Sequence, residues 1–329
     1  MKKIFIKLLL FGAIVSGCSK SKATVAVPEP APVTKSDFKV VGYLFANSDL
    51  LAVSARLDFS QITHLNIAFI NPDTSGVFAP VTGLKELVKK AHEQGVKVLS
   101  AFGGGGPPQH LKELVKPANK KVLVDGLMGL VSTYDLDGID VDLEGDFITA
   151  DYEAFVVDLS AALKAKSKLM TAAVATWNSA AYTNKAIVLF DLINIMSYDH
   201  TGPWRKNDPG PHSTYEAAEQ DFVHWNVNRG IAADKLLLGL PFYGYGFGPD
   251  ILESINFADL VTAYPGSEKV DVWGLPGKGT FYYNGLPTIK KKVAYAMDKK
   301  AAGVMIWQLL GDAKGDMSLL KAINEVAKK

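Results

Sequence analysis

The sequence predicts an α/β protein built as one (β/α)8 TIM barrel, in which eight parallel strands are each followed by a helix. Two observations support this prediction. From residue 38 onward, short runs rich in Val, Ile and Leu alternate with longer stretches of helical periodicity. Eight such units follow one another along the chain, and eight is the number of strands that closes a barrel of this kind.

The predicted strands are short and apolar, which is typical of parallel strands covered on both faces. They span residues 40–45, 64–70, 97–102, 138–144, 169–176, 192–198, 235–243 and 303–307. The predicted helices between them span residues 83–94, 120–133, 151–166, 214–229 and 288–300, and a last helix spans 317–328. A brief helix is expected near 180–188, whereas the first link, 47–59, has the weakest helical pattern.

A doubly wound open sheet is the structural alternative. Such sheets usually carry a glycine-rich dinucleotide turn after the first strand, and Phe45-Ala46-Asn47-Ser48 is not such a turn. The barrel is therefore expected to span 38–329. Residues 248–287 contain several Gly and Pro pairs, and we expect an elaborated loop after the seventh strand, with at most a small hairpin.

The first 37 residues are predicted to be targeting and linker segments. Two lysines and an apolar stretch precede Val15-Ser16-Gly17-Cys18, which resembles the cleavage box of bacterial lipoproteins. On this interpretation residues 1–17 are a signal peptide, Cys18 carries the lipid, and 18–37 is a proline-rich extended linker. The protein is then exported and anchored in the cell envelope, at the outer membrane or cell surface. An ordinary secretory signal with a chance cysteine is the alternative.

Composition excludes several classes of function. The formal net charge is +1, so there is no basic excess to neutralise the phosphates of a nucleic acid. None of the six histidines forms a His-x-His or His-Glu-x-x-His pair, so we expect neither a metal site nor a cofactor. A metal-dependent hydrolase is the hypothesis that this argument disfavours. Nothing in the sequence indicates an obligate partner, and we expect a monomer.

The 138–144 strand carries a row of acids. Asp140, Asp142 and Glu144 alternate with apolar residues, so their side chains should lie on one face of the strand. Three carboxylates this close cannot all ionise at low cost, and at least one pKa should be raised. A solvated edge strand is the alternative interpretation, while a calcium loop fails because its glycine and trailing glutamate are missing. In a barrel, Glu144 falls at the C-terminal end of its strand, where active sites lie.

Aromatic residues fall at the same ends of other predicted strands. Trp177, Tyr198, Tyr243 and Trp307 are predicted to converge there, together with Asp199. This combination suits a sugar ligand, because aromatic rings stack on the C–H faces of a sugar and polar groups bond its hydroxyls.

These segments resemble family 18 glycoside hydrolases, the chitinase-like enzymes. Residues 137–144 match the family's Asp-Gly-x-Asp-x-Asp-x-Glu signature, and Met196-Ser197-Tyr198-Asp199 matches its Met-x-Tyr-Asp motif. Segments 41–43, 238–244 and 302–307 resemble its first, seventh and eighth strands. The resemblance runs in the right order from residue 38 to the C-terminus.

The resemblance implies retaining hydrolysis in which the substrate's own 2-acetamido oxygen is the nucleophile. Glu144 is implied to be the general acid and then the base. Asp142 is implied to orient the acetamido N–H, Asp140 to share a proton with Asp142, and Tyr198 to donate to the acetamido oxygen. Trp307 is implied to stack beneath the sugar.

Further substrate contacts are expected from Asp199, Met196, Tyr243, Tyr43 and Trp177. The expected substrate is a poly- or oligosaccharide of N-acetylglucosamine, such as chitin. Asp137 is out of phase with the row of acids and is expected to be structural.

The chain also departs from the family pattern, because Ala101 stands where the family usually has Ser and Gly105 where it often has Trp. The missing aromatic favours one alternative, an endo-β-N-acetylglucosaminidase that cleaves N-glycan cores. A non-catalytic surface protein that binds carbohydrate is a further alternative, although such proteins usually lose the acid and Glu144 is present.

Overall fold

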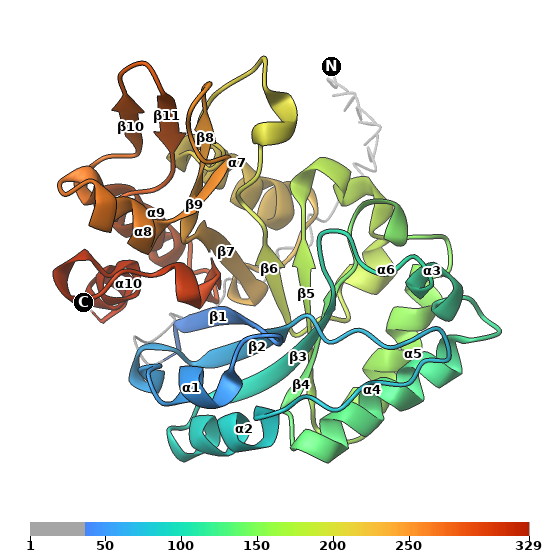
Figure 1. Ribbon diagram of the computed structural model, residues 1–329. Coiled ribbons are helices and arrows are strands. Elements are labelled where there is room, and N and C mark those ends of the chain that lie inside the picture. Colours follow the sequence, from blue (N-terminus) through green and yellow to red (C-terminus); the bar gives the residue numbers. More distant parts are fainter. Residues whose placement is uncertain (1–36, 329) are drawn as a thin grey trace, which may run out of the picture.

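A computed structural model describes residues 37–328 of the 329-residue chain. Its main sheet consists of the strands β1 Lys39–Phe45, β2 His64–Ala68, β3 Lys97–Gly103, β4 Gly138–Asp142, β5 Leu169–Val174, β6 Leu192–Ile195, β7 Leu236–Pro241 and β12 Gly303–Trp307. They pair in parallel and close into a barrel in the order β1-β12-β7-β6-β5-β4-β3-β2 (Figure 1). The predicted fold class is confirmed. Several predicted strands extended two or three residues further, because their last residues belong to the loops above the barrel.

Helices surround the barrel on its outer side (Figure 1). They are α1 Leu50–Ser54, α2 Leu84–Glu93, α3 Leu111–Leu114, α4 Lys120–Tyr134, α5 Tyr152–Lys164, α6 Asn184–Ile187, α7 Tyr215–Val223, α9 Leu286–Asp298 and α10 Leu319–Ala327. The weak 47–59 pattern corresponds to the five-residue α1, and the brief helix near 180–188 corresponds to α6. The predicted 214–229 helix is α7 followed by a wider π-type turn, His224–Asn228. α3 is too short to leave a periodic signal.

The helices bury the apolar stripe that the sequence predicts. In α2, Leu84, Leu87, Val88 and Ala91 are all buried, at the spacing that places side chains on one face of a helix. Their burial against the strands forms the shell of the core between barrel and helices. The barrel interior and the loops at the strand ends are not part of this shell. Active sites of such barrels lie there.

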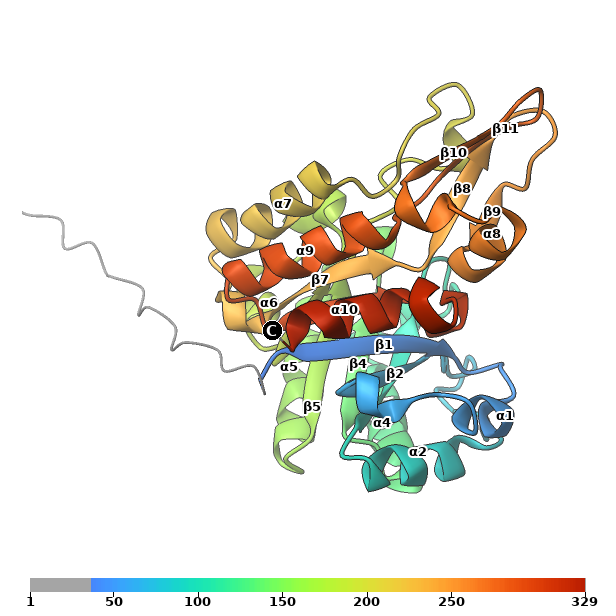
Figure 2. The ribbon, with the colours of Figure 1, turned by 90° about the vertical axis from the view of Figure 1, so that its left-hand side faces the viewer.

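A second, smaller sheet departs from the prediction of at most a hairpin. It contains the antiparallel strands β8 Tyr243–Phe247, β9 Ser254–Asn256, β10 Val272–Leu275 and β11 Gly279–Tyr282 in the order β10-β11-β8-β9, with α8 Phe257–Ala263 beside it. Figure 2 shows it projecting beyond the C-terminal end of β7. The barrel strand ends at Pro241 and β8 already begins at Tyr243, so the insertion begins before residue 248.

The predicted signal segment, Cys18 and all but the last residue of the linker lie outside the described residues. Within residues 37–328, no helix has the combination of length and apolar character that a membrane span requires.

Candidate active site

A pocket of about 140 Å³ opens at the C-terminal ends of the barrel strands. Its lining comes from at least six strands or the loops that follow them, which is why no single stretch of sequence describes it. The lining residues are Tyr43, Phe69, Gly105, Asp142, Glu144, Ala173, Met196, Tyr198, Asp199 and Trp307. The structure therefore brings together most of the residues that the sequence predicted for the site.

Asp140 lies below the pocket and is fully buried. Its carboxylate accepts hydrogen bonds from the Tyr43 hydroxyl (2.6 Å), the Asn194 side-chain amide (3.1 Å) and the Thr171 hydroxyl. Burial raises the pKa of Asp140 to about 6, although all three donors oppose the shift. Three donors on one carboxyl group favour its ionised form, so Asp140 is the carboxylate of the row at neutral pH.

Asp142 has the opposite environment. It is 3% exposed, and its Oδ1 has no hydrogen-bond partner among the described residues. Burial, followed by the charges of Glu144 and Asp140, raises the pKa of Asp142 well above its usual range. This environment favours the protonated form of Asp142 over the carboxylate. The expected sharing of a proton between Asp142 and Asp140 stays a prediction.

Glu144 continues the row although β4 ends at Asp142. Its backbone is extended (φ −117°, ψ 158°), so the alternation of side chains persists and Glu144 points to the same side as the two aspartates. Burial, and then the charge of Asp199, raises the pKa of Glu144 to about 7. A carboxyl group that keeps its proton near neutrality can act as a general acid.

Asp199 stands opposite the row, in a left-handed backbone conformation (φ 62°) that Asp tolerates better than most residues. Its Oδ1 accepts a hydrogen bond from the Tyr243 hydroxyl (2.5 Å) and lies 3.2 Å from Nδ1 of His212. Tyr243 does not line this pocket, and its expected contact with substrate stays a prediction. Tyr198 is buried, and its hydroxyl meets only the weak acceptor Met305 Sδ, at 3.7 Å. It is free to donate to a better acceptor.

Aromatic rings hold Trp307 in place at the pocket floor. The centroids of Tyr43, Phe45 and Phe69 lie 5.3–5.5 Å from the indole, and the Phe69 ring is nearly parallel to it at 26°. These contacts fix the plane of the indole and leave its pocket face available for stacking. The peptide bonds Ala68–Phe69 and Trp307–Gln308, beside two of these residues, are cis.

The glycine run after β3 packs against the acid row. A Cβ at Gly103 would lie 2.1 Å from the Asp142 carbonyl oxygen, and Gly103 adopts a φ of +103°, so no other residue fits. A Cβ at Gly105 would lie 3.6 Å from Glu144 Oε1. The space that a larger residue would occupy at position 105 is therefore open, directly beside the acid.

Trp177 lies at the rim and is not part of the pocket lining. It is 76% exposed, and its indole lies next to Gly145, the residue after Glu144. Its expected contact with substrate stays a prediction.

Sequence reasoning missed four residues that the structure places at the site: Phe69, Thr171, Asn194 and His212. A signal existed for two of them. Thr171 and Asn194 are polar residues within otherwise apolar strands, and strands of a barrel interior tolerate such residues only with partners. Thr171 lies next to Asp140 in the β4–β5 register and supplies a hydroxyl, whereas Ala101 on the other side has none.

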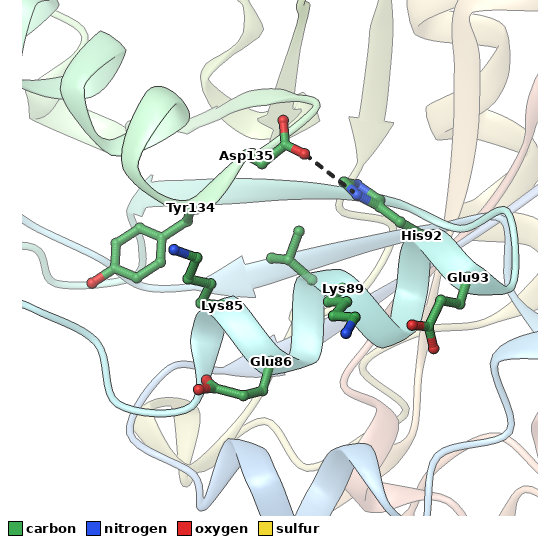
Figure 3. Close-up of a pocket in the computed structure, with 8 residues that line it drawn as sticks. Lys85, Glu86, Lys89, His92, Glu93, Tyr134 and Asp135 are labelled. Atoms are coloured by element: carbon green, nitrogen blue, oxygen red, sulfur yellow. Dashed lines mark ion pairs between the residues drawn. The ribbon is translucent and has the colours of Figure 1, made fainter.

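A larger hollow, of about 700 Å³, lies on the outside of the barrel between α2 and the end of α4 (Figure 3). Charges of both signs line it, and His92 forms a long ion pair of 3.9 Å with Asp135 there. His92 also bonds Asp137 (2.9 Å), whose carboxylate accepts from the Val98 N–H, so Asp137 is structural as predicted. Within residues 37–328 no group of three or more His, Cys, Asp or Glu side chains is arranged to hold a metal ion.

Comparison with known proteins places this geometry in a family. The profile described as Glycosyl hydrolases family 18 matches residues 39–312. The chain is 35% identical to the GH18 chitinase ChiB from the chitin utilization locus of Flavobacterium johnsoniae, with a TM-score of 0.82 over 88% of this chain and 94% of that one. A chitinase structure from Bacteroides thetaiotaomicron is 26% identical, with a TM-score of 0.78 over 89% and 97% of the two chains.

Among curated proteins, Chitinase C of Streptomyces lividans is 28% identical over 277 residues, which cover 69% of this chain and 44% of that protein. The chain spans between 14% and 55% of the length of the first curated relatives that it matches.

Proposed function

Because this chain belongs to glycosyl hydrolase family 18, we propose that it is an active glycosidase that cleaves β-1,4-linked N-acetylglucosamine in chitin or chito-oligosaccharides. The observation that carries the proposal is the row of three carboxyl groups, whose environments differ. Three donors favour the carboxylate form of Asp140, whereas burial raises the pKa of Glu144 to about 7 and that of Asp142 well above its usual range. Groups whose environments push their pKa values apart can divide acid and base roles.

In the proposed reaction, Glu144 donates its proton to the glycosidic oxygen and the bond to the leaving sugar breaks. The substrate's 2-acetamido oxygen attacks the anomeric carbon and forms an oxazolinium ion. Glu144, now a carboxylate, then takes a proton from water, which attacks the same carbon and restores the acetamide. Both displacements invert the anomeric centre, so the product retains its configuration.

The remaining residues orient the acetamide. Asp142, with an unpartnered buried oxygen beside Glu144, is proposed to accept a hydrogen bond from the acetamido N–H, since an orphaned acceptor gains most from a new donor. Tyr198 is proposed to donate to the acetamido oxygen, and Trp307 to stack beneath the sugar ring. Such alignment converts a bimolecular attack into an intramolecular one.

Replacing Glu144 with Gln tests the proposal. Turnover of N-acetylglucosamine tetramer should fall by at least about a thousandfold, because an amide cannot donate the proton. Binding of the trimer, followed by intrinsic tryptophan fluorescence, should persist. Asp146→Asn is the matched control, since Asp146 lies two residues away but is exposed and paired with Lys112 (2.6 Å). A wild-type protein that binds the trimer without cleaving it would instead support the non-catalytic alternative.

A second candidate substrate is the chitobiose core of N-glycans. The open space at Gly105, beside Glu144, favours it, because a missing aromatic there leaves room for a bulky or branched partner on the leaving side. The chemistry would be the same. Parallel assays on chitin oligomers and on a high-mannose glycoprotein decide between the two, since we expect faster release of chitobiose from the oligomers.

We also propose that the protein is a lipoprotein of the bacterial cell envelope, anchored through Cys18. Support comes from the position of the chain's single cysteine directly after an apolar stretch and two small residues. Cells that express the full chain with an alkyne fatty acid should yield a labelled, membrane-bound protein. Cys18→Ala should remain unlabelled, and a labelled Cys18→Ala variant would refute the assignment.

A further inference from the structure

Lys292 is a buried lysine outside the lining of the substrate pocket, and its hydrogen bonds connect it through Ser213 to the segment that carries Tyr198 and Asp199. We propose that Lys292 of α9, acting through Ser213, is a positioning residue that fixes Tyr198 and Asp199 for catalysis. The inference rests on the proposed function, because it concerns the geometry of the same site.

Lys292 is fully buried, and its Nζ lies among three oxygen acceptors. These are the Ser213 carbonyl (2.9 Å), the Ser213 hydroxyl (2.7 Å) and the Asn284 side-chain carbonyl (2.7 Å). An ammonium group has three hydrogens, so it can satisfy all three acceptors at once. The three contacts join α9 to Asn284, which follows the second sheet, and to Ser213, which lies in the loop between β6 and α7.

Ser213 passes this constraint to the segment that carries the site residues. Its hydroxyl donates to the Ser197 carbonyl at 2.6 Å, so the same oxygen accepts from Lys292 through a lone pair. Asn284 Nδ2 also donates to the Ser213 carbonyl (2.7 Å), which closes a ring of contacts. Ser197 immediately precedes Tyr198. The carbonyl that begins the Tyr198 peptide unit is therefore held by a side chain that Lys292 anchors.

The residue before Ser213 completes the link. His212 is fully buried, and its Nδ1 lies 3.2 Å from Asp199 Oδ1. Its ring packs between Tyr243 and Tyr245, at centroid distances of 5.0 and 4.9 Å. Burial lowers the pKa of His212, so the ring is neutral, and its Nδ1 contacts both the carboxylate (3.2 Å) and the backbone N–H (3.4 Å) of Asp199. A shift of Ser213 would thus displace contacts on both sides of the Tyr198–Asp199 pair.

The charge environment argues against a role in stability alone. Burial lowers the pKa of Lys292 to about 7, although the carboxylates of Asp271, Asp221 and Glu216 oppose the shift. None of these forms an ion pair with Lys292 among the described residues. Asp221 instead accepts from the Ser197 hydroxyl (2.6 Å), and Asp271 from the Gly285 N–H (2.8 Å). Burying a lysine without a contacting carboxylate costs free energy of folding, so a gain in site geometry is the better account of its presence.

Lys292→Met removes the donors while keeping the length of the side chain, and Lys291→Met is the control. Lys291 is exposed on the same helix and stacks over the Tyr215 ring (3.5 Å), so its loss perturbs α9 without touching Ser213. With chito-oligosaccharide substrate and well below the melting temperature, we expect Lys292→Met to lower kcat at least tenfold with KM changed less than threefold. Lys291→Met should leave both unchanged.

The pH dependence of kcat separates positioning from general loss of folded protein. The charge of Asp199 raises the pKa of Glu144, so an Asp199 that moves away should shift the alkaline limb of the profile to lower pH. If Lys292 acted only as a distant positive charge, its removal would shift the alkaline limb to higher pH. Ser213→Ala, a smaller change, should reproduce the downward shift, and the double variant should be no worse than Lys292→Met. The inference is overturned if both kcat and the position of the alkaline limb are unchanged in Lys292→Met and in Ser213→Ala.

Failure of the proposed function has a different signature. In that case the wild-type protein and Lys291→Met do not hydrolyse the oligomers at all. The inference is then decided by a crystal structure of Ser213→Ala, in which the Asp199 Oδ1 to His212 Nδ1 contact should be broken. A contact that stays near 3.2 Å would refute it.

Discussion

Replacing Thr171 with Val tests whether Asp140 is held as a buried carboxylate. Thr171 is one of three donors on Asp140, and Val keeps the shape of the side chain without the hydroxyl. A hydrogen bond to a charged group contributes about 1.5–3 kcal/mol. At about 1.4 kcal/mol per unit, its loss should raise the pKa of Asp140 by about one to two units above its present value of about 6.

The sign of the effect on stability follows from the raised pKa. Because the pKa of Asp140 in the folded protein exceeds the ordinary value of 3.8, Asp140 favours the folded state below pH 3.8, and this contribution is lost as the pH rises through about 6. In Thr171→Val the loss continues to higher pH. The substitution should therefore cost about 1.5–3 kcal/mol of unfolding free energy at pH 8, and about 1 kcal/mol or less at pH 4, where the acid is neutral.

Urea unfolding at pH 4 and pH 8 measures this difference. Thr176→Val is the control, because the Thr176 hydroxyl accepts from the neutral Trp225 indole N–H (3.1 Å) and its loss should cost the same at both pH values. If Thr171→Val also costs the same at both, Asp140 is not the group that titrates, and the division of roles along the acid row is wrong.

Three further predictions follow from the site. Asp199→Asn removes the charge that, after burial, raises the pKa of Glu144 to about 7, so the alkaline limb of kcat against pH should move to lower pH; an unmoved limb contradicts this. Trp177→Ala should raise KM for the tetramer severalfold with kcat nearly unchanged, and a loss confined to kcat would exclude stacking at the rim. Dialysis against EDTA should leave turnover intact, whereas activity lost and then restored by a divalent cation would revive a metal-dependent mechanism.

The barrel and the acid row are predictable from sequence because both follow from local periodicity. The period-two alternation through Asp140, Asp142 and Glu144 fixes which side chains share a face, and the structure preserves it even where the strand has ended. Apolar runs alternating with amphipathic helices likewise allow few topologies other than a parallel barrel or open sheet.

The partners of the row are not predictable in the same way. Thr171 and Asn194 meet Asp140 from other strands, so their roles depend on strand order and register, which periodicity does not contain. His212 reaches Asp199 from a loop 13 residues downstream. The second sheet was underestimated because glycines alternate with aromatics in β8, a pattern that resembles loop composition as much as a strand.

The most direct test of the central claim is the effect of the substrate's acyl group on kcat. An N-acetylglucosamine oligomer can carry a trifluoroacetyl group in place of acetyl on the sugar bound over Trp307, which withdraws electrons from the amide oxygen with little change in shape. If that oxygen is the nucleophile, kcat should fall at least about a hundredfold while KM stays nearly constant. Equal kcat values for the two substrates would show that the acetamide does not attack, and that an enzyme carboxylate or water does.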